Sequence, residues 1–362
     1  MAKKIMTVTG PISPEQLGKT SMHEHVLMNG MVMQHSKTWL DKIPLAPDTP
    51  LQMDNIGLIS HNGMMTYDAV DMRDEELMIA EVGDFKAAGA DSMLEVSAVG
   101  IRADVAGVKR IAVKNDVQVV TCTGFYISQS WPEQFKGMSV KQLREFMLGE
   151  VKNGIEDTGV YPGVVKIGMD AYSPDEQNAL RAAAQVAKET GLSLTIHPSD
   201  RVGADAITNV EAVIKEGLDP SRVVIAHVGS SIVEHSLKTL ITDPSSWKFD
   251  ITHVQRLVDM GVTVCTEFLG QNVADELGSA TIGTTDHQRM ALIYELVKRG
   301  HADQIVLGTD TCAKMLTRRY GGEGYLRLWN FVIPLMRKIL GMSEYCIDQI
   351  FVENPKRILA YD

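Results

Sequence analysis

The strongest constraint on the fold is a repeated alternation of short apolar runs with longer amphipathic ones. From about residue 90 onward, runs rich in β-branched residues alternate with stretches whose apolar residues recur at helical spacing. This rhythm is typical of βα units packed around a parallel sheet. The strand candidates are residues 20–27, 92–99, 117–126, 163–169, 192–198, 222–229, 262–268 and 304–310.

Eight such strands favour a closed (β/α)8 barrel. A doubly wound open sheet is the alternative, but it usually has fewer strands and often a glycine-rich phosphate loop, and neither GxGxxG nor GxxxxGK[ST] occurs here. A barrel takes roughly 250 residues. We therefore expect one barrel domain over residues 1–362, with an insertion at 28–70 over the barrel mouth. Helices are expected at 138–154, 175–191, 205–217, 285–300 and 325–340.

The amino-acid composition argues against some classes of binding partner. The chain has 46 Asp and Glu against 35 Lys and Arg, and the resulting net charge of -11 opposes binding to phosphate backbones. No apolar run reaches the roughly 18 residues of a membrane span. We expect a small-molecule substrate, with neither nucleic acid nor a membrane as partner. The start MAKKIMTVTG shows no secretory pattern and the cysteines show no CxxC spacing, which predicts a cytoplasmic location.

Metal-ligand and proton-carrying residues stand at the ends of five strand candidates, where barrel enzymes place their chemistry. One histidine at a strand end is usually a hydrogen-bonded core residue. Several histidines and an aspartate at corresponding places favour a metal site instead. The number of candidate ligands is sufficient for two metal ions. The residues are His23 and His25, which share one face of their strand, and Lys166, His197, His227 and Asp310.

Lys166 is the unusual member of this set, because an ammonium would be repelled by cations in a low-dielectric interior. If its amine reacted with CO2, the resulting carbamate would be an anion with two oxygens, suited to bridging two metals. A salt-bridged lysine and a Schiff-base lysine are the alternatives. Spacing alone does not separate the three hypotheses.

These residues lie within motifs that, in their order along the chain, resemble those of the phosphotriesterase family in the amidohydrolase superfamily. One such motif is weak, whereas the ordered set is highly specific. The motifs are GPI at 10–12, HEH at 23–25, TGFY at 123–126, GIEDTG at 154–159, GVVK at 163–166, His197, IAHVG at 225–229, LGTD at 307–310 and NP at 354–355.

The resemblance implies a deformed (β/α)8 barrel holding two divalent ions, usually zinc, with manganese, cobalt or iron as alternatives. In the family pattern, His23, His25 and Asp310 bind the more buried ion, and His197 and His227 bind the more exposed one. Lys166, carboxylated by CO2, bridges the ions together with a hydroxide. That hydroxide is the nucleophile, and Asp310 accepts its proton. Many members form dimers, so a homodimer is a further hypothesis.

The resemblance favours a lactone or related carboxylic ester as substrate. The segment 314–325 resembles the YGGxGY loop of a lactonase-like branch. Tyr126 is a candidate for orienting a substrate carbonyl. Candidates for binding an anionic substrate group are Lys314, Arg318, Arg102 and Arg201.

One strand end departs from the family pattern. The seventh strand ends in Glu267-Phe268, where lactonase relatives often have an Asp-Arg pair, and the following loop 269–286 is long. This departure leaves the leaving-group pocket, and therefore the substrate, undefined.

Three other functions stay open at this stage. A bridging hydroxide can attack phosphorus, which makes phosphoester hydrolysis the main alternative. The chain could instead be a metal-free binding protein that keeps the barrel but not the chemistry, although all six ligand positions are intact. A Schiff-base lyase that uses Lys166 is the third alternative.

Overall fold

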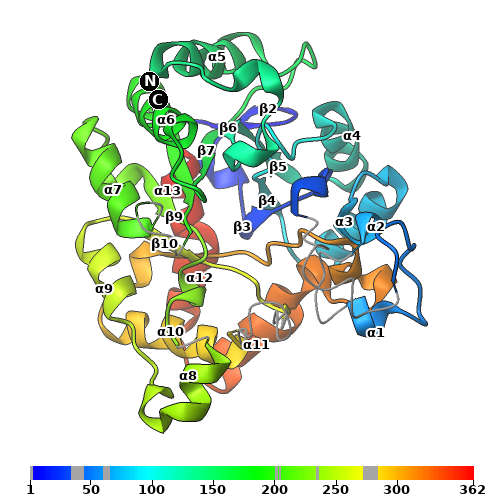
Figure 1. The fold of residues 1–362 in the computed structure, drawn as a ribbon, viewed down its shortest axis with the longest axis vertical. Helices are drawn as coiled ribbons and strands as arrows, with labels where there is room; N and C mark the ends of the chain where they lie inside the picture. The colour runs from blue at the N-terminus through cyan, green and yellow to red at the C-terminus, as the bar shows by residue number, and fades with distance from the viewer. Residues whose placement is uncertain are drawn as a thin grey trace.

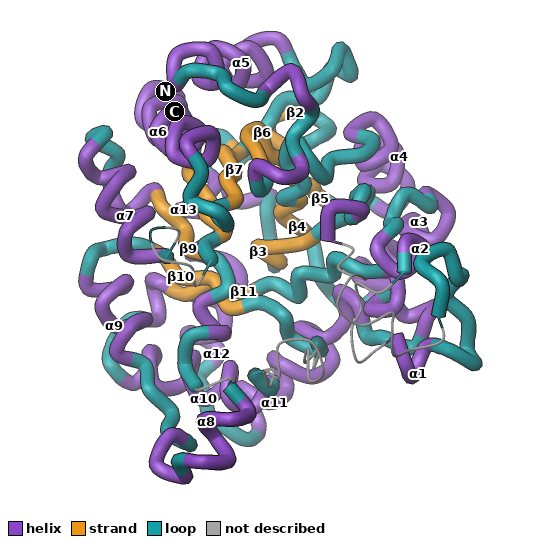
Figure 2. Tube along the Cα trace, viewed as in Figure 1, coloured by secondary structure: helices purple, strands orange, loops and turns teal. Residues whose placement is uncertain are grey.

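The computed structural model describes residues 3–33, 45–59, 66–199, 203, 205–233, 236–271 and 284–362. Within these residues, strands gather at the centre of the molecule and helices surround them (Figure 1, Figure 2). The central strands pair in parallel with one another. They are β3 (Thr20–Glu24), β4 (Ser92–Glu95), β5 (Gln118–Val120), β6 (Cys122–Phe125), β7 (Val164–Gly168), β8 (Ser193–His197), β9 (Val223–Ile225), β10 (Thr263–Thr266) and β11 (Ile305–Leu307).

These strands form a closed ring. The predicted strand 117–126 is interrupted at Thr121, so that β5 pairs with β4 and β6 pairs with β7. The ring closes between β11 and β3, where the backbone N–H of Asp310 donates to the carbonyl of His23 at 3.0 Å. The predicted (β/α)8 barrel is therefore confirmed, and the open doubly wound sheet is excluded.

Side-chain alternation along each strand separates the barrel interior from the helix layer. On β7, Val164 belongs to the interior cluster, whereas Val165 and Ile167 pack toward the helices. Lys166 has the same parity as Val164 and so faces inward. The N-terminal ends of the strands are closed by the hairpin β1 (Ile5–Thr7) and β2 (Gly10–Ile12) and by α13 (Asn354–Leu359), whose Ile358 and Leu359 join the interior cluster. The open end of the barrel is thus the end that carries the predicted site.

Helices cover the outside of the barrel (Figure 2). Four of the predicted helices are confirmed to within a few residues: α5 (Val140–Asn153), α6 (Pro174–Thr190), α7 (Ala206–Lys215) and α10 (Asp286–Lys298). For α6, Ser173 forms a capping box at the start and Gly191, with φ 76°, ends the helix in the left-handed region. Three further helices were not predicted from the sequence: α3 (Glu75–Ala87), α4 (Val105–Asn115) and α9 (Thr252–Asp259).

The predicted helix at 325–340 is wrong in part. A π-helical turn over Leu328–Val332 precedes α11 (Ile333–Lys338), and α12 (Glu344–Asp348) follows. Pro334 lies at the start of α11 and has no N–H to continue the regular hydrogen-bond ladder, which accounts for the widened turn before it. Among the described residues, no helix combines the length and hydrophobicity that a membrane span requires.

The predicted insertion at 28–70 is described only in part, because residues 34–44 and 60–65 lie outside the described residues. Its described parts include α1 (Ile56–Ile59) and α2 (Tyr67–Val70), and Met28 and Asn29 form β-bridges with Arg102 and Asp71. The short helix α8 (Leu237–Thr242) lies at the lower edge in Figure 1. Residues 272–283 of the long loop after β10 are also outside the described part of the chain.

The closure of the barrel predicts that Gly308 does not tolerate a side chain. A Cβ atom at Gly308 would lie 2.6 Å from the carbonyl oxygen of His23 and 2.7 Å from its Cβ, so Gly308→Ala has to push β11 away from β3. We expect a loss of about 1–3 kcal/mol in the free energy of unfolding, measured by denaturant titration.

The matched control is Gly149→Ala, since Gly149 lies inside α5 with open space around its Cβ position and alanine favours a helix. Equal stability of Gly308→Ala and the wild type would show that the two strands are not in tight contact.

Candidate metal centre

The six predicted strand-end residues come together at the open end of the barrel. His23 lies in β3, with His25 directly after it, Lys166 lies in β7 and His197 ends β8. The remaining two follow strands, His227 after β9 and Asp310 after β11. His23, His25, Lys166 and Asp310 are buried, and His197 and His227 are partly buried.

A first group consists of His23, His25 and Asp310, whose ligand atoms all lie within 4.8 Å of one another. The Nε2 atom of His25 is 3.1 Å from Oδ1 of Asp310, and Nε2 of His23 is 3.8 Å from the same oxygen. Burial and the nearby Lys166 lower the pKa of His23 to about 4, so its imidazole is neutral near pH 7. Burial would raise the pKa of Asp310, but the adjacent imidazoles of His23 and His25 hold it below its usual range.

A second group consists of His197 and His227. Nδ1 of His197 lies 2.6 Å from Nε2 of His227, so the two rings direct nitrogen atoms at the same point. Burial, together with His227, lowers the pKa of His197 well below its ordinary value. A neutral imidazole is the form that binds a metal ion.

Lys166 lies beside the first group. Its Nζ atom is 3.5 Å from Nε2 of His23, and the residue is 2% exposed. Burial lowers the pKa of Lys166, which favours the uncharged amine.

Three residues at this end of the barrel have left-handed backbones although none is glycine. The φ angles are 62° for His227, 59° for Phe268 and 51° for Asp310. Such conformations are costly for side chains other than glycine, and they gather at functional sites where the surrounding structure enforces them. Here they turn the chain directly after β9, β10 and β11.

The donor set fits a metal ion. Among the described residues, four buried atoms at this centre make no hydrogen bond: Nδ1 of His23, Nδ1 of His227, Oε1 of Glu267 and Oδ1 of Asp310. Imidazole nitrogens and carboxylate oxygens are the ligands that zinc and similar divalent metals take in proteins. A cation would satisfy these atoms and would relieve the close approach of the two imidazole nitrogens.

Two buried carboxylates that the sequence analysis did not single out support β3. Glu24 accepts hydrogen bonds from Ser21 at 2.5 Å and from the backbone N–H of Thr309 at 2.8 Å, and burial raises its pKa to about 7. Glu95 accepts from the backbone N–H of Ser97, whose hydroxyl lies 2.8 Å from Nδ1 of His25. The sequence signal for Glu24 was its place inside the HEH motif, on the opposite face from the histidines.

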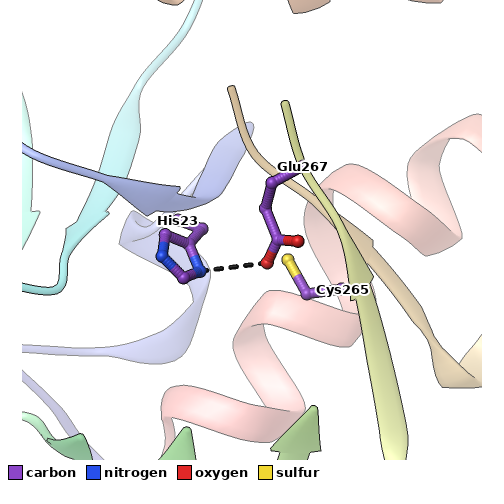
Figure 3. Close-up of side chains that lie close together, drawn as sticks. All are labelled: His23, Cys265 and Glu267. Atoms are coloured by element: carbon purple, nitrogen blue, oxygen red, sulfur yellow. Dashed lines mark ion pairs between the residues drawn. The ribbon is translucent and has the colours of Figure 1, made fainter. Parts of the chain in front are cut away.

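A third buried carboxylate, Glu267, directly follows β10 and lies among the histidines. Its Oε1 atom is 2.9 Å from Nδ1 of His23, and Cys265 lies beside it on the same face of the strand (Figure 3). Burial would raise the pKa of Glu267, but His227 and His23 lower it to about 2. In the sequence, Glu267 stood out only as a departure from the family pattern at the leaving-group pocket, although its position at a strand end matched that of the other site residues.

Two cavities meet at this centre. The inner one has a volume of about 130 Å³, is lined by Tyr126, Phe268 and the residues of the first group, and reaches Lys166. The outer one has a volume of about 560 Å³ and shares His197 and Phe268 with the inner one. The ring of Tyr126 meets His197 edge to face, with 5.3 Å between the ring centroids.

Three of the four predicted anion-binding cations pair with carboxylates of this chain. Nζ of Lys314 is 2.6 Å from Asp68, and Arg318 pairs with Asp84. Arg102 lines a separate cavity of about 520 Å³, and its side chain is 5% exposed. Arg102 lies 2.6 Å from Glu150 and 3.2 Å from Glu156, and Arg201 is outside the described residues.

The loop 314–325 is tied to the site through its last residue. The hydroxyl of Tyr325, which is buried, donates to the backbone carbonyl of His25 at 2.5 Å. The loop 314–325 therefore supports the chain at the end of β3, next to two of the predicted ligands.

The fold and this centre define a class of protein, a (β/α)8 barrel whose open end carries histidines and carboxylates able to hold metal ions. The model of the phosphotriesterase family matches residues 3–359. The chain belongs to the phosphotriesterase family.

Relatives cover the chain almost completely. The N-acetyltaurine hydrolase of Xenopus tropicalis is 28% identical and covers 100% of this chain and 99% of its own length. The phosphotriesterase-related protein of Nematostella vectensis is 27% identical, over 98% of each chain. These names support a hydrolase of this family.

Two solved structures share the fold. A resiniferatoxin-binding protein from Rhodobacter sphaeroides superposes with a TM-score of 0.87 at 27% identity, over 98% of this chain and 94% of its own. A lactonase from Listeria monocytogenes superposes with a TM-score of 0.74 at 22% identity, over 99% of both chains, and so supports the fold alone.

The buried ion pair of Arg102 predicts that removing its guanidinium group lowers the stability of the protein. Arg102→Leu leaves Glu150 buried without its guanidinium partner, so we expect the free energy of unfolding to fall by about 3–5 kcal/mol, measured with denaturant. The double variant with Glu150→Leu should recover part of this loss.

The control is Arg110→Leu, because Arg110 pairs with Glu75 at an exposed position and should change stability little. A normally stable Arg102→Leu protein with a raised KM would instead support substrate binding by Arg102.

Proposed function

We propose that the protein is a binuclear metal-dependent hydrolase of a carboxylic acyl bond, in a lactone, a related ester or an amide. The observation that carries the proposal is the convergence of two imidazole pairs, a carboxylate and Lys166 at the mouth of the barrel. In this proposal His23, His25 and Asp310 hold one ion, and His197 and His227 hold the other. Zinc suits these ligands, with manganese, cobalt or iron as alternatives.

Lys166 is proposed to join the two subsites as a carbamate. Its buried amine has a lowered pKa, and a neutral amine is the form that adds to CO2, with loss of one proton. The product would place two anionic oxygens near His23 in a pocket that disfavours an unpartnered ammonium.

The metals, when bound, would make a nucleophilic hydroxide available near neutral pH and polarise the bond under attack. Asp310 is proposed as the proton acceptor, because its lowered pKa keeps it ionised and its Oδ1 atom has no hydrogen-bond partner. Burial raises the pKa of Tyr126, so its phenol remains protonated at the cavity wall and is proposed to donate to the substrate carbonyl. Phe268 lines both the inner and the outer cavity.

An acyl substrate is favoured over a phosphoester by two observations. Relatives at 27–28% identity are named for hydrolysis of an N-acetyl compound, in which water attacks a carbonyl carbon. The inner cavity of about 130 Å³ suits a short acyl group, and the outer one of about 560 Å³ has room for a larger leaving group.

A substrate panel tests the proposal, with lactones, N-acyl amines and aryl phosphoesters offered to the metal-loaded protein. We expect turnover of an acyl substrate. Exclusive turnover of the phosphoesters would reverse the assignment, and metal-independent trapping of a substrate on Lys166 by borohydride would point to a lyase.

Asp310→Asn should lower kcat by roughly 10²–10⁴-fold, because an amide cannot accept the proton. Metal content must be measured on the same samples by atomic emission. Near-normal kcat in a variant that holds both metals would refute the role of Asp310.

The carbamate predicts that metal loading depends on CO2. Metal-free protein should regain its metals faster in bicarbonate than in CO2-depleted buffer, followed by metal analysis after gel filtration. Lys166→Met is the control, since it has no amine and should show no bicarbonate effect. Identical loading of the wild type in both buffers would argue for an unmodified Lys166.

A further inference from the structure

Glu267 is a buried carboxylate that lies among the proposed metal ligands but is not one of them. It follows β10, the strand between the two that lead to His227 and Asp310, and it is 0% exposed. Its carboxylate lies between a histidine of the first group and a histidine of the second. Each carboxylate oxygen of Glu267 faces a different one of these two histidines.

The first oxygen faces His23. Oε1 of Glu267 lies 2.9 Å from Nδ1 of His23, which is an ion-pair distance although the pair lacks the geometry of a hydrogen bond. Figure 3 marks this ion pair with a dashed line. An ionised carboxylate only accepts hydrogen bonds, so the imidazole nitrogen that faces it carries the ring proton. The lone pair of His23 is then on Nε2, the atom that points to Asp310 and Lys166.

The second oxygen faces His227. The backbone N–H of His227 donates to Oε2 of Glu267 at 2.6 Å, and Nδ1 of the same residue is 3.5 Å from that oxygen. The backbone of His227 is left-handed, with φ 62°. This hydrogen bond holds the strained residue in the conformation that brings its Nε2 atom to His197.

We propose that Glu267 is a positioning residue that couples the two metal subsites, setting the tautomer of His23 through one oxygen and the backbone of His227 through the other. The inference rests on the proposed function, in which these histidines bind different ions. Carboxylates that hold ligating histidines typically change metal affinity 10–100-fold when they are removed.

The nearby thiol offers a competing explanation. His23, Cys265 and Glu267 could themselves hold a metal ion, because one ligand atom from each lies within 4.8 Å of the others. The 2.9 Å separation of His23 and Glu267 is that of directly paired atoms rather than of two ligands on opposite sides of an ion.

Glu267→Gln is the discriminating variant. The N–H of His227 needs an acceptor, so the amide oxygen should face it and the amide NH2 should face His23. His23 would then accept at Nδ1 and carry its proton on Nε2, where it blocks the first ion. We expect one ion to bind 10–100-fold more weakly in chelator competition while the other is retained.

Three further variants complete the comparison. Glu267→Asp keeps an acceptor and should restore part of the affinity. Glu150→Gln neutralises another buried carboxylate, which contacts Arg102 and Thr123 instead of a histidine, and should leave both ions in place. Cys265→Ser should also keep both ions, and loss of an ion there would overturn the proposal in favour of the thiol site.

The tautomer can be read directly in metal-free wild-type protein. A long-range ¹⁵N–¹H spectrum of histidine-labelled protein, with His23 assigned by its substitution, should show the proton on Nδ1. A proton on Nε2, or unchanged binding of both ions by Glu267→Gln, would overturn the role of Glu267. Absence of metal binding by the wild type would instead overturn the proposed function on which it rests.

Discussion

The contact between β3 and β11 is the constraint on which the rest of the structure depends. These strands come from opposite ends of the chain, and they carry or precede His23, His25 and Asp310. Their backbones approach so closely that only glycine fits at position 308, and Glu24 ties β3 to Thr309 at the same level. The first and last residues of the candidate site are far apart in the sequence. They come together only because the barrel closes between β3 and β11.

The interior of the barrel concentrates carboxylates at the site end. Glu24, Glu95 and Glu267 are each 2% exposed or less, and each accepts a hydrogen bond from a residue at the end of a neighbouring strand. Buried charge is costly unless it is paired or hydrogen-bonded, so these residues fix the strand ends in one arrangement. Their backbone and hydroxyl donors come from residues adjacent to the proposed ligands, which gives the site a rigid support below and beside the cavity.

Three cations near the barrel mouth form ion pairs that join separate segments of the chain. Lys314 and Arg318 fasten the loop after β11 to Asp68 and Asp84, and Arg102 fixes Glu150 behind the second and third strands. In the described part of the chain, Tyr126 and Phe268 line the inner cavity beside the proposed ligands.

The sequence by itself determined the barrel and the six polar residues at its mouth, because period-two alternation and the position of a residue at a strand end are local properties. It also predicted α5, α6, α7 and α10 from spacing and caps, but not α3, α4, α9 or the π-turn before Pro334. Only the tertiary structure decided what Glu24, Glu267, Arg102 and Lys314 do. Ion pairs and hydrogen bonds join residues far apart in the chain, and whether a charge is buried among histidines or paired at the rim depends on which segments packing brings beside it.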